Sequence, residues 1–450
     1  MRTEIQIPHI SDLSPGKTAW STVPSTWSNQ YRPSSFRNID SFAAHVAHEM
    51  TSATDSSQIT QPSWCSFQGV TCGSVSRNLS YASITSIDLT DMALSGTLPA
   101  IISSFGTITY FSLQRNKIFG KIPNAIGAWT RIQAIDLEDN SLTGTIPYII
   151  SMLTSLRQLY LNTNQLGGTI PRFIGTLTSL MDLSLSSNHL TGSIPSNIGA
   201  LRSLQILNLQ ENKLTGIIPS SIGTARSLKM LSVYSNSLKG PIPSSIGDLR
   251  SLVGLYLYSN SLTGTIPLTI GSLNSLQMLY LQENKLTGSI PSSIGSLTSL
   301  KMLTAHSNTL KGSIPCSIGD LKSLVGLYLH SNSLTGIIPT NIKSLEKLKY
   351  VEFQNNLLVD TPSTETTSET SSNLAEEIVT ISDSVSPLAD TVMPPPSPEN
   401  ISSEKSVSHN IATPNAQLKL ISSQQAVVNT VLPFNANGAT LNSKSAQEQT

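Results

Sequence analysis

The sequence predicts a repeat solenoid of the α/β type, in which twelve coils, each formed by one repeat, stack around one elongated core. Three observations predict it. The chain matches itself at a constant, unbroken period of 24 residues, apolar residues make up 38% of it, and charged residues only 12%. A typical globular protein has about 25% charged residues. A short, unbroken period indicates stacked repeats rather than separate globular domains.

One repeat shows how each coil is built. Residues 276–299 read LQMLYLQENKLTGSIPSSIGSLTS, and the ninth position is an asparagine in eleven repeats of this same length. The array spans 84–359. Its first repeat has Met92 in place of the asparagine and its last loses the pattern after residue 356. Atypical end repeats are expected of capping coils. The recurring asparagines are Asn116, Asn140, Asn164, Asn188, Asn212, Asn236, Asn260, Asn284, Asn308, Asn332 and Asn356.

The start of each repeat predicts a short strand. Leu279 and Leu281 alternate with Tyr280 and Gln282, a period of two that buries one face. One coil cannot bury that face alone, so we expect the strands of successive coils to pair in a parallel sheet. The Ile-Pro step of each repeat is expected outside that sheet, on the far side of the coil, because proline donates no backbone hydrogen bond.

The asparagines are predicted to form a structural ladder. An amide side chain carries both a donor and an acceptor, so it can satisfy backbone groups left unpaired where a strand turns inward. Replacing a mid-array member such as Asn236 by leucine is expected to cost about 1 to 3 kcal/mol.

The second half of the repeat, LxGxIPxxIGxL, resembles the plant-type leucine-rich repeat of receptor-kinase ectodomains, receptor-like proteins and polygalacturonase-inhibiting proteins. The resemblance covers the array 84–359, well over half of the chain. Upstream, WCSFQGVTC at 64–72 is similar to the N-terminal cap of that family. The resemblance implies a disulfide between Cys65 and Cys72. It also implies a curved superhelix whose concave parallel sheet binds a ligand, a cell-surface or secreted location, and a possible co-receptor.

The chain is divided into four predicted parts. Residues 1–40 are an unassigned or disordered extension, 41–83 the cap, 84–359 the solenoid, and 360–450 a disordered acidic tail rich in Ser, Thr and Pro. Residues 361–450 carry nine acidic and three basic side chains. Their composition is too polar to offset the entropy of ordering. Asn78 and Asn400 lie in Asn-x-Ser sequons and are candidate glycosylation sites.

The compartment is predicted from two opposing observations. Residues 1–24 contain no apolar core typical of a signal peptide, and no apolar run is long enough to span a bilayer. Either Met1 is internal to a longer reading frame, or the protein stays inside the cell. The cysteine pair of the cap favours an oxidising compartment, so we expect an extracellular or cell-surface protein.

The predicted ligand-binding surface lies on the concave face. Side chains at the third, fifth, seventh and eighth positions of each repeat alternate with buried leucines and should face solvent. Rings recur there in one strip about 20 Å long, since strands lie about 4.8 Å apart. The strip is predicted to be exposed and consists of Tyr234, Tyr256, Tyr258, Tyr280, His306, Tyr328 and His330.

Two explanations of this strip stay open. Tyrosine is enriched at binding hot spots, which favours a binding surface. However, residues 204–275 match residues 276–347 at 52 of 72 positions, so duplication and the sheet preference of aromatic residues also explain it.

A smaller acidic group marks the N-terminal end of the same face. This group could bind a basic ligand or a hard cation. The alternative is that it is simply a solvated negative surface. Tyr110, Ser112 and Arg115 of the intervening coil are expected to interrupt it. The group is Asp88, Asp91, Asp136, Glu138 and Asp139.

Catalytic and metal-binding motifs are absent from the sequence, so no cofactor, metal or enzymatic activity is predicted. His306 and His330 lack a third ligand, and His45 and His48 are interpreted as surface residues of a cap helix. Cys316 aligns with Ser244 of the duplicated block and is interpreted as a tolerated substitution. A net charge of zero disfavours a nucleic-acid partner.

The sequence therefore predicts a non-catalytic recognition scaffold that binds a protein, peptide or glycan on its concave face, as a receptor-like protein in signalling or defence. Two alternatives remain at this stage. One is a secreted inhibitor of a wall-degrading glycoside hydrolase, and the other is a structural wall or adhesion protein.

Overall fold

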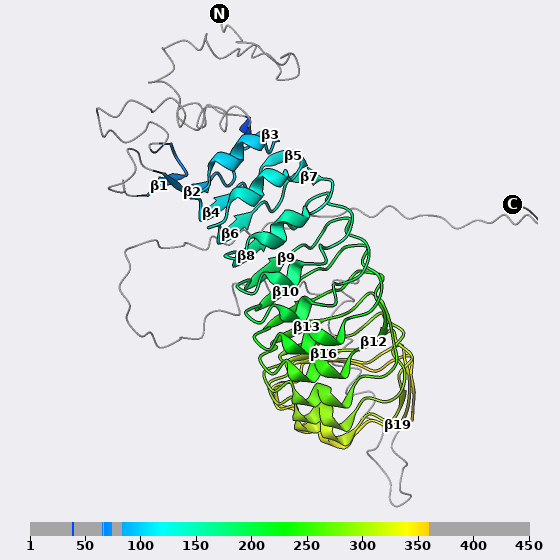
Figure 1. Cartoon of the computed structure of the whole chain (residues 1–450). Coiled ribbons are helices and arrows are strands. Elements are labelled where there is room, and N and C mark those ends of the chain that lie inside the picture. The colour runs from blue at the N-terminus through cyan, green and yellow to red at the C-terminus, as the bar shows by residue number, and fades with distance from the viewer. Residues whose placement is uncertain (1–37, 40–64, 66, 74–82, 360–450) are drawn as a thin grey trace, which may run out of the picture. The chain divides into compact units, whose positions relative to one another are not determined.

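The solenoid is a stack of short coils, shown as coloured ribbon in Figure 1. In a computed structural model of the chain, the described residues are 38–39, 65, 67–73 and 83–359. Each coil begins with a strand, turns, and returns through an extended segment and, in most coils, a short 3₁₀ helix. The predicted extension, most of the predicted cap and the predicted tail lie outside the described residues.

One sheet of 13 strands runs the length of the solenoid. Neighbouring strands from β2 to β20 are parallel and pair with a shift of one repeat, as Ile206 pairs with Met230, whereas β1 is antiparallel to β2. The strands are β1 (Val70–Cys72), β2 (Ile84–Asp88), β4 (Tyr110–Ser112), β6 (Ala134–Asp136), β8 (Gln158–Tyr160), β9 (Asp182–Ser184), β10 (Ile206–Asn208), β11 (Met230–Ser232), β13 (Gly254–Tyr256), β15 (Met278–Tyr280), β16 (Met302–Thr304), β18 (Gly326–Tyr328) and β20 (Tyr350–Glu352).

Short strands after the turn form three smaller parallel sheets, which the sequence does not predict. One of these strands, β12, ends with a proline, Pro241, whose missing N–H is not needed for the backbone pairing of the sheet. These strands are β3 (Ser95–Thr97), β5 (Lys117–Lys121), β7 (Ser141–Thr143), β12 (Lys239–Pro241), β14 (Ser261–Thr263), β17 (Lys311–Gly312), β19 (Ser333–Ile337) and β21 (Leu357–Val359).

The far side of the coils carries 3₁₀ helices. Most begin directly after the proline of the Ile-Pro step, as η14 does after Pro291, whose carbonyl oxygen accepts from the backbone N–H of Ile294 at 3.0 Å. The helices are η6 (Ala100–Ser104), η7 (Asn124–Ala128), η8 (Tyr148–Met152), η9 (Ile174–Thr176), η10 (Ile198–Ala200), η11 (Ser220–Thr224), η12 (Ser244–Asp248), η13 (Leu268–Ser272), η14 (Ser292–Ser296), η15 (Cys316–Asp320) and η16 (Thr340–Ser344).

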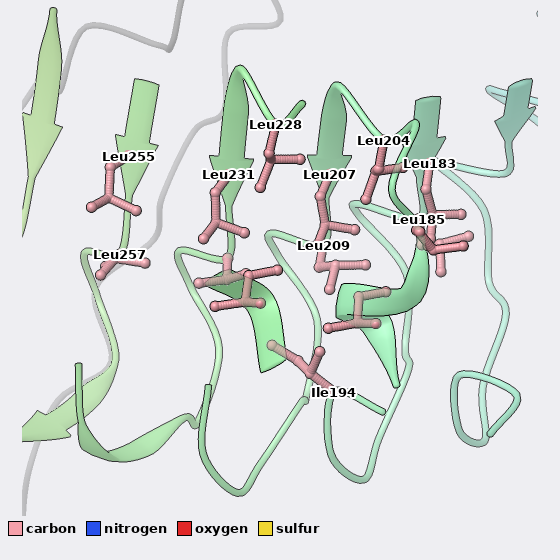
Figure 2. Packing of buried hydrophobic residues seen from close by; sticks show 14 of the residues in the cluster. Leu183, Leu185, Ile194, Leu204, Leu207, Leu209, Leu228, Leu231, Leu255 and Leu257 are labelled. Carbon is pink, nitrogen blue, oxygen red and sulfur yellow. The ribbon is translucent and has the colours of Figure 1, made fainter. Parts of the chain in front are cut away.

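The core is continuous along the stack. Figure 2 shows the leucines of consecutive strands in rows, with Leu183, Leu207, Leu231 and Leu255 at equivalent positions. All four are at most 1% exposed, as are most leucines at the first, fourth and sixth positions of the repeat. Each coil therefore buries its apolar residues against the coils on both sides, which a single coil cannot do.

The asparagine side chains link adjacent coils by hydrogen bonds. Asn236 Nδ2 donates to the carbonyl oxygens of Leu209 in the preceding coil and of Val233 and Tyr234 in its own. Its Oδ1 accepts from the backbone N–H of Leu214 at 2.9 Å. The residue before each asparagine has a positive φ, 50° at Ser235. That turn exposes backbone groups which the amide then satisfies.

The first coil is covered by β1, whose last residue, Cys72, takes part in a disulfide. Cys65 and Cys72 are bonded, with their Cα atoms 5.7 Å apart, as the family resemblance implies. Among the described residues, no helix has the length and apolar composition needed to cross a membrane.

Candidate functional site

The strand face is the outward side of the 13-stranded sheet, formed by the third, fifth, seventh and eighth residues of each coil. Because the strands pair in register, residues at one position of successive coils lie next to one another in a row. The fifth-position row runs from Ser232 to Tyr256 and Tyr280. Side chains from neighbouring coils can therefore stack at the strand spacing of about 4.8 Å.

Four tyrosines at the centre of this face pack against one another. The rings of Tyr234 and Tyr258 stack with centroids 4.2 Å apart and 9° between their planes. Tyr256 and Tyr280 stack at 5.2 Å, and Tyr258 lies 6.2 Å from Tyr280. We call these four residues the tyrosine cluster.

The prediction that these tyrosines are exposed is wrong. Tyr234, Tyr256, Tyr258 and Tyr280 are 9%, 1%, 7% and 6% exposed. The alternation of the strand places them on the outer face correctly, but neighbouring rows bring ring against ring and cover most of each ring. Burial raises the pKa of the Tyr234 hydroxyl to about 12, so the cluster is neutral at physiological pH.

A glycine sets the position of Tyr256. A Cβ atom added to Gly254 would lie 2.6 Å from Cε2 of Tyr256. The ring therefore folds back along its own strand, over the position that a side chain would otherwise fill. Gly326 and Tyr328 repeat this arrangement in the duplicated block, where the ring lies 3.0 Å from the added Cβ.

The C-terminal end of the strand face is more open. His306, Tyr328 and His330 are each half-buried. The two imidazoles stack with centroids 4.2 Å apart and 11° between planes, and His330 Nδ1 lies 3.0 Å from Glu352 Oε2. Burial lowers the pKa of His330, and the Glu352 carboxylate partly opposes that shift. We call His306, Tyr328, His330, Tyr350 and Glu352 the open end.

Tyr350 is a residue that the sequence prediction missed. It occupies the third position of the last coil and is 46% exposed, the most of any ring on the strand face. The prediction followed rings at the fifth and seventh positions only. An aromatic residue in the third position of the last repeat, which forms the last strand of the sheet in the described part of the chain, was the available signal.

The N-terminal end of the strand face carries the predicted acidic group. Burial raises the pKa of Asp136 to about 7, with smaller contributions from the carboxylates of Glu138 and Asp88. The backbone N–H of Glu138 donates to Asp136 at 3.1 Å, and Gln114 Nε2 of the intervening coil donates to Glu138 at 2.9 Å. That coil therefore bridges the acidic group, whereas the sequence predicts that it interrupts the group.

Asp182 extends the acidic end by two coils beyond Asp136. Tyr160 Oη donates to its carboxylate at 3.0 Å and Gln158 Nε2 donates at 3.2 Å. The sequence prediction did not include Asp182, because it lies in the third position of its coil. With it, carboxylates extend over the first five coils of the strand face.

Two hydroxyl groups between the ends are buried without a hydrogen-bond partner. They are Ser232 Oγ and Tyr256 Oη, on residues that are each 1% exposed. Their residues are adjacent in the fifth-position row. A buried polar atom left unpaired costs about 1 to 3 kcal/mol, so these hydroxyls destabilise the centre of the face until they gain a partner.

The other predicted sites are distributed elsewhere. Cys316 is a free, exposed thiol on η15, remote from the strand face. Within the part of the chain that the structure describes, no three His, Cys, Asp or Glu side chains are grouped to hold a metal ion. His45, His48, Asn78 and Asn400 lie outside the described residues.

The comparisons with known proteins identify the class of this solenoid. The family described as "Leucine-rich repeat region" matches residues 253–416. The one described as "Leucine rich repeat" matches 178–238 and 202–262, and a further repeat model matches 155–177. No curated protein sequence matches the chain.

Several solved structures similar to this chain are ectodomains of plant receptors. One is the Arabidopsis receptor kinase HAESA in complex with the peptide hormone IDA and the co-receptor SERK1, at 32% identity and a TM-score of 0.61, with 71% of this chain and 54% of that chain covered. Another is the leucine-rich-repeat ectodomain of the Arabidopsis thaliana membrane receptor kinase GASSHO1/SCHENGEN3 with Casparian strip integrity factor 2. It has 34% identity and a TM-score of 0.53, with 59% and 35% covered.

A plant ice-binding protein is also similar, at 28% identity and a TM-score of 0.50, with 62% of this chain and 90% of that chain covered. The chain thus spans about a third to about half of the receptor ectodomains it matches. It is a leucine-rich-repeat solenoid, and it belongs to the plant-type leucine-rich-repeat proteins.

Proposed function

We propose that this protein is an extracellular, receptor-like scaffold that binds a peptide along its strand face. The observation that carries the proposal is the continuous face itself, acidic at one end, aromatic at its centre and open at the other. Similar solved structures hold peptide hormones, which supports a peptide over a glycan. The disulfide of the cap supports an oxidising compartment.

The open end is the place where a ligand has most to contact. Tyr350 offers an exposed ring, and Tyr328 and His330 offer half-buried rings beside the Glu352 carboxylate. Aromatic side chains give large contact area at a low entropic cost. The tyrosine cluster, being already packed, serves as the rigid floor that holds neighbouring contact residues in place.

The test is a set of single alanine variants of the full chain, measured for binding to peptides selected from a displayed random library. Tyr328→Ala and Tyr350→Ala are expected to lower affinity about tenfold or more, as hot-spot residues do. Tyr148→Ala is the matched control, because Tyr148 is 65% exposed on η8 and away from the strand face. Equal affinity of all three variants would refute the proposal.

A second candidate function, ice binding, has one observation in its favour. Threonines recur on the smaller sheets at the twelfth and fourteenth positions of the coils, where Thr169 pairs with Thr191 and Ser193 with Thr215. These exposed hydroxyls form a regular row at the coil spacing. Lys239 and Lys311 interrupt it, so the row is shorter than the solenoid.

Ice binding is tested by measuring thermal hysteresis of the full chain. Activity that Thr191→Lys and Thr215→Lys abolish would establish the second candidate. Activity no greater than that of an equal concentration of an unrelated globular protein would exclude it.

A further inference from the structure

Charge is strongly segregated between the strand face and the rest of the solenoid. The coils 84–359 contain twelve acidic and nineteen basic residues. Nine of the acidic residues occupy the third, fifth, seventh or eighth positions, which form the strand face. Arg115 is the one Lys or Arg residue at these positions. The nine are Asp88, Asp91, Asp136, Glu138, Asp139, Asp182, Glu211, Glu283 and Glu352.

The remaining surface of the coils has the opposite charge. It carries eighteen basic residues and three acidic ones, Asp248, Asp320 and Glu346. The net charge of the whole chain, zero, therefore hides a strand face on which acidic residues outnumber basic ones by eight. Such a face attracts and orients cationic ligands.

Neutral groups position most of these carboxylates. Ser187 Oγ donates to Glu211 at 2.7 Å, Ser259 Oγ donates to Glu283 at 2.5 Å, and Thr90 Oγ1 donates to Asp88 at 2.7 Å. Neutral donors also serve Glu138 and Asp182, as described above. These donors hold the carboxylates in place without adding positive charge. The negative charge available to a ligand is that of the ionised carboxylates, since Asp136 is partly protonated near pH 7.

Independent of the charges, the same face holds the buried, unpartnered hydroxyls of Ser232 and Tyr256. They lie between the acidic end and the open end. A ligand that crosses the face from one end to the other passes over them, and it supplies the missing hydrogen-bond partners once the covering side chains move aside.

From this arrangement we infer that the ligand is a basic peptide in extended conformation, with its cationic residues over the N-terminal coils and its apolar or aromatic residues over the open end. The inference rests on the proposed function and adds the chemical class of the ligand. Eight strand steps separate β6, which carries Asp136, from β18, which carries Tyr328. At about 4.8 Å per step this distance is about 38 Å, which about 12 extended residues span.

The experiment is selection of random peptides about 12 residues long on the immobilised full chain, followed by sequencing of the enriched pool. Three proteins are compared. They are the wild type, a face variant (Asp136→Asn, Glu138→Gln, Asp182→Asn) and a matched control variant (Asp248→Asn, Asp320→Asn, Glu346→Gln). Both variants lose three carboxylates, but the control loses all of them outside the strand face. Thermal unfolding verifies that each variant is folded.

The expected result is a pool enriched in Lys and Arg for the wild type and the control variant, with that enrichment lost for the face variant. Peptides from the wild-type pool should bind the face variant at least tenfold more weakly, and binding to wild type should weaken in high salt. A neutral or acidic pool, or a basic pool that persists on the face variant, would overturn the inference.

These outcomes separate the inference from the proposed function. A neutral pool whose peptides lose affinity for Tyr328→Ala leaves the proposed peptide-binding face intact and refutes only its basic ligand class. A pool indistinguishable from the unselected library refutes peptide binding, and the basic ligand class with it.

Discussion

The imidazole rings of His306 and His330 stack face to face, 4.2 Å between centroids, in the place where the phenol rings of Tyr234 and Tyr258 stack at the same distance in the preceding block. The two pairs occupy equivalent positions of the duplicated blocks 204–275 and 276–347. The two blocks therefore share the stacked geometry, with a neutral ring pair in one and a titratable pair in the other.

The histidine pair should make the last coils sensitive to acid. Burial lowers the pKa of His330 below that of an unfolded histidine, about 6.5. The unfolded chain then binds more protons than the folded protein near that pH. The stability that neutral His330 contributes is therefore complete above about pH 6.5 and is lost as the pH falls.

The double variant His306→Tyr, His330→Tyr restores the ring pair of the preceding block. We expect its free energy of unfolding to change less than that of wild type between pH 7.5 and pH 5, because wild type loses the stability contributed by neutral His330 over that range. Chemical denaturation at the two pH values measures this difference. Parallel pH profiles of the two proteins would contradict it.

Asp136 should have the opposite pH dependence. Its pKa is about 7 in the folded protein against about 3.9 in an unfolded chain. The folded protein therefore holds the extra proton between these values, and stability from this group falls as the pH rises from about 4 to about 7.

Asp136→Asn removes the carboxylate and retains an oxygen that can accept from the Glu138 N–H. At pH 8 it should be more stable than wild type by about 1 kcal/mol, since solvent screening reduces the upper limit of about 4 kcal/mol set by the shift. At pH 4 the two proteins should have the same free energy of unfolding. Asp139→Asn, an exposed change in the same coil, is the control. Its stability relative to wild type, measured by thermal unfolding, should be the same at pH 4 and pH 8.

The asparagine ladder predicts a stability loss for Asn236→Leu. The leucine removes four hydrogen bonds to backbone groups, 2.9 to 3.1 Å long. Each backbone group left buried and unpaired costs about 1 to 3 kcal/mol, so a loss of at least about 2 kcal/mol is expected by denaturant unfolding. Asn274→Leu, at an exposed position of the return path, should leave stability within about 0.5 kcal/mol.

Substitution of Gly254 by alanine is expected to displace the ring of Tyr256. In Gly254→Ala, the new Cβ meets the ring of Tyr256 at 2.6 Å, so the ring must leave its position over the strand. A loss of about 1 to 3 kcal/mol is expected, as for other overpacked sites. Gly106→Ala adds a Cβ with no heavy atom within 4 Å, and unaltered thermal unfolding is expected there. A loss of equal size in both variants would contradict the role assigned to Tyr256.

Much of the fold follows from the sequence because the repeat has no insertions. A constant period places every leucine, asparagine and glycine of the repeat at one position of one coil, so the strands, their parallel register and the rows of the strand face are determined by counting. The strand from Met278 to Tyr280 begins two residues after the repeat does, and so do most others. The family resemblance follows from the same residues, whereas the 3₁₀ conformation of the return path and the smaller sheets do not.

Tertiary structure decided which side chains of that face a ligand can reach. The period assigns Tyr256 and Tyr328 to equivalent positions, yet the first is 1% exposed and the second is half-buried. Exposure depends on the volume of side chains in the coils on either side, which the alternation within one strand does not contain. Tyr256 has the ring of Tyr280 against its own, whereas the neighbours of Tyr328 in the fifth-position row are Thr304 and Glu352, which have no ring. The sequence by itself determined the face, and packing between coils determined its open end.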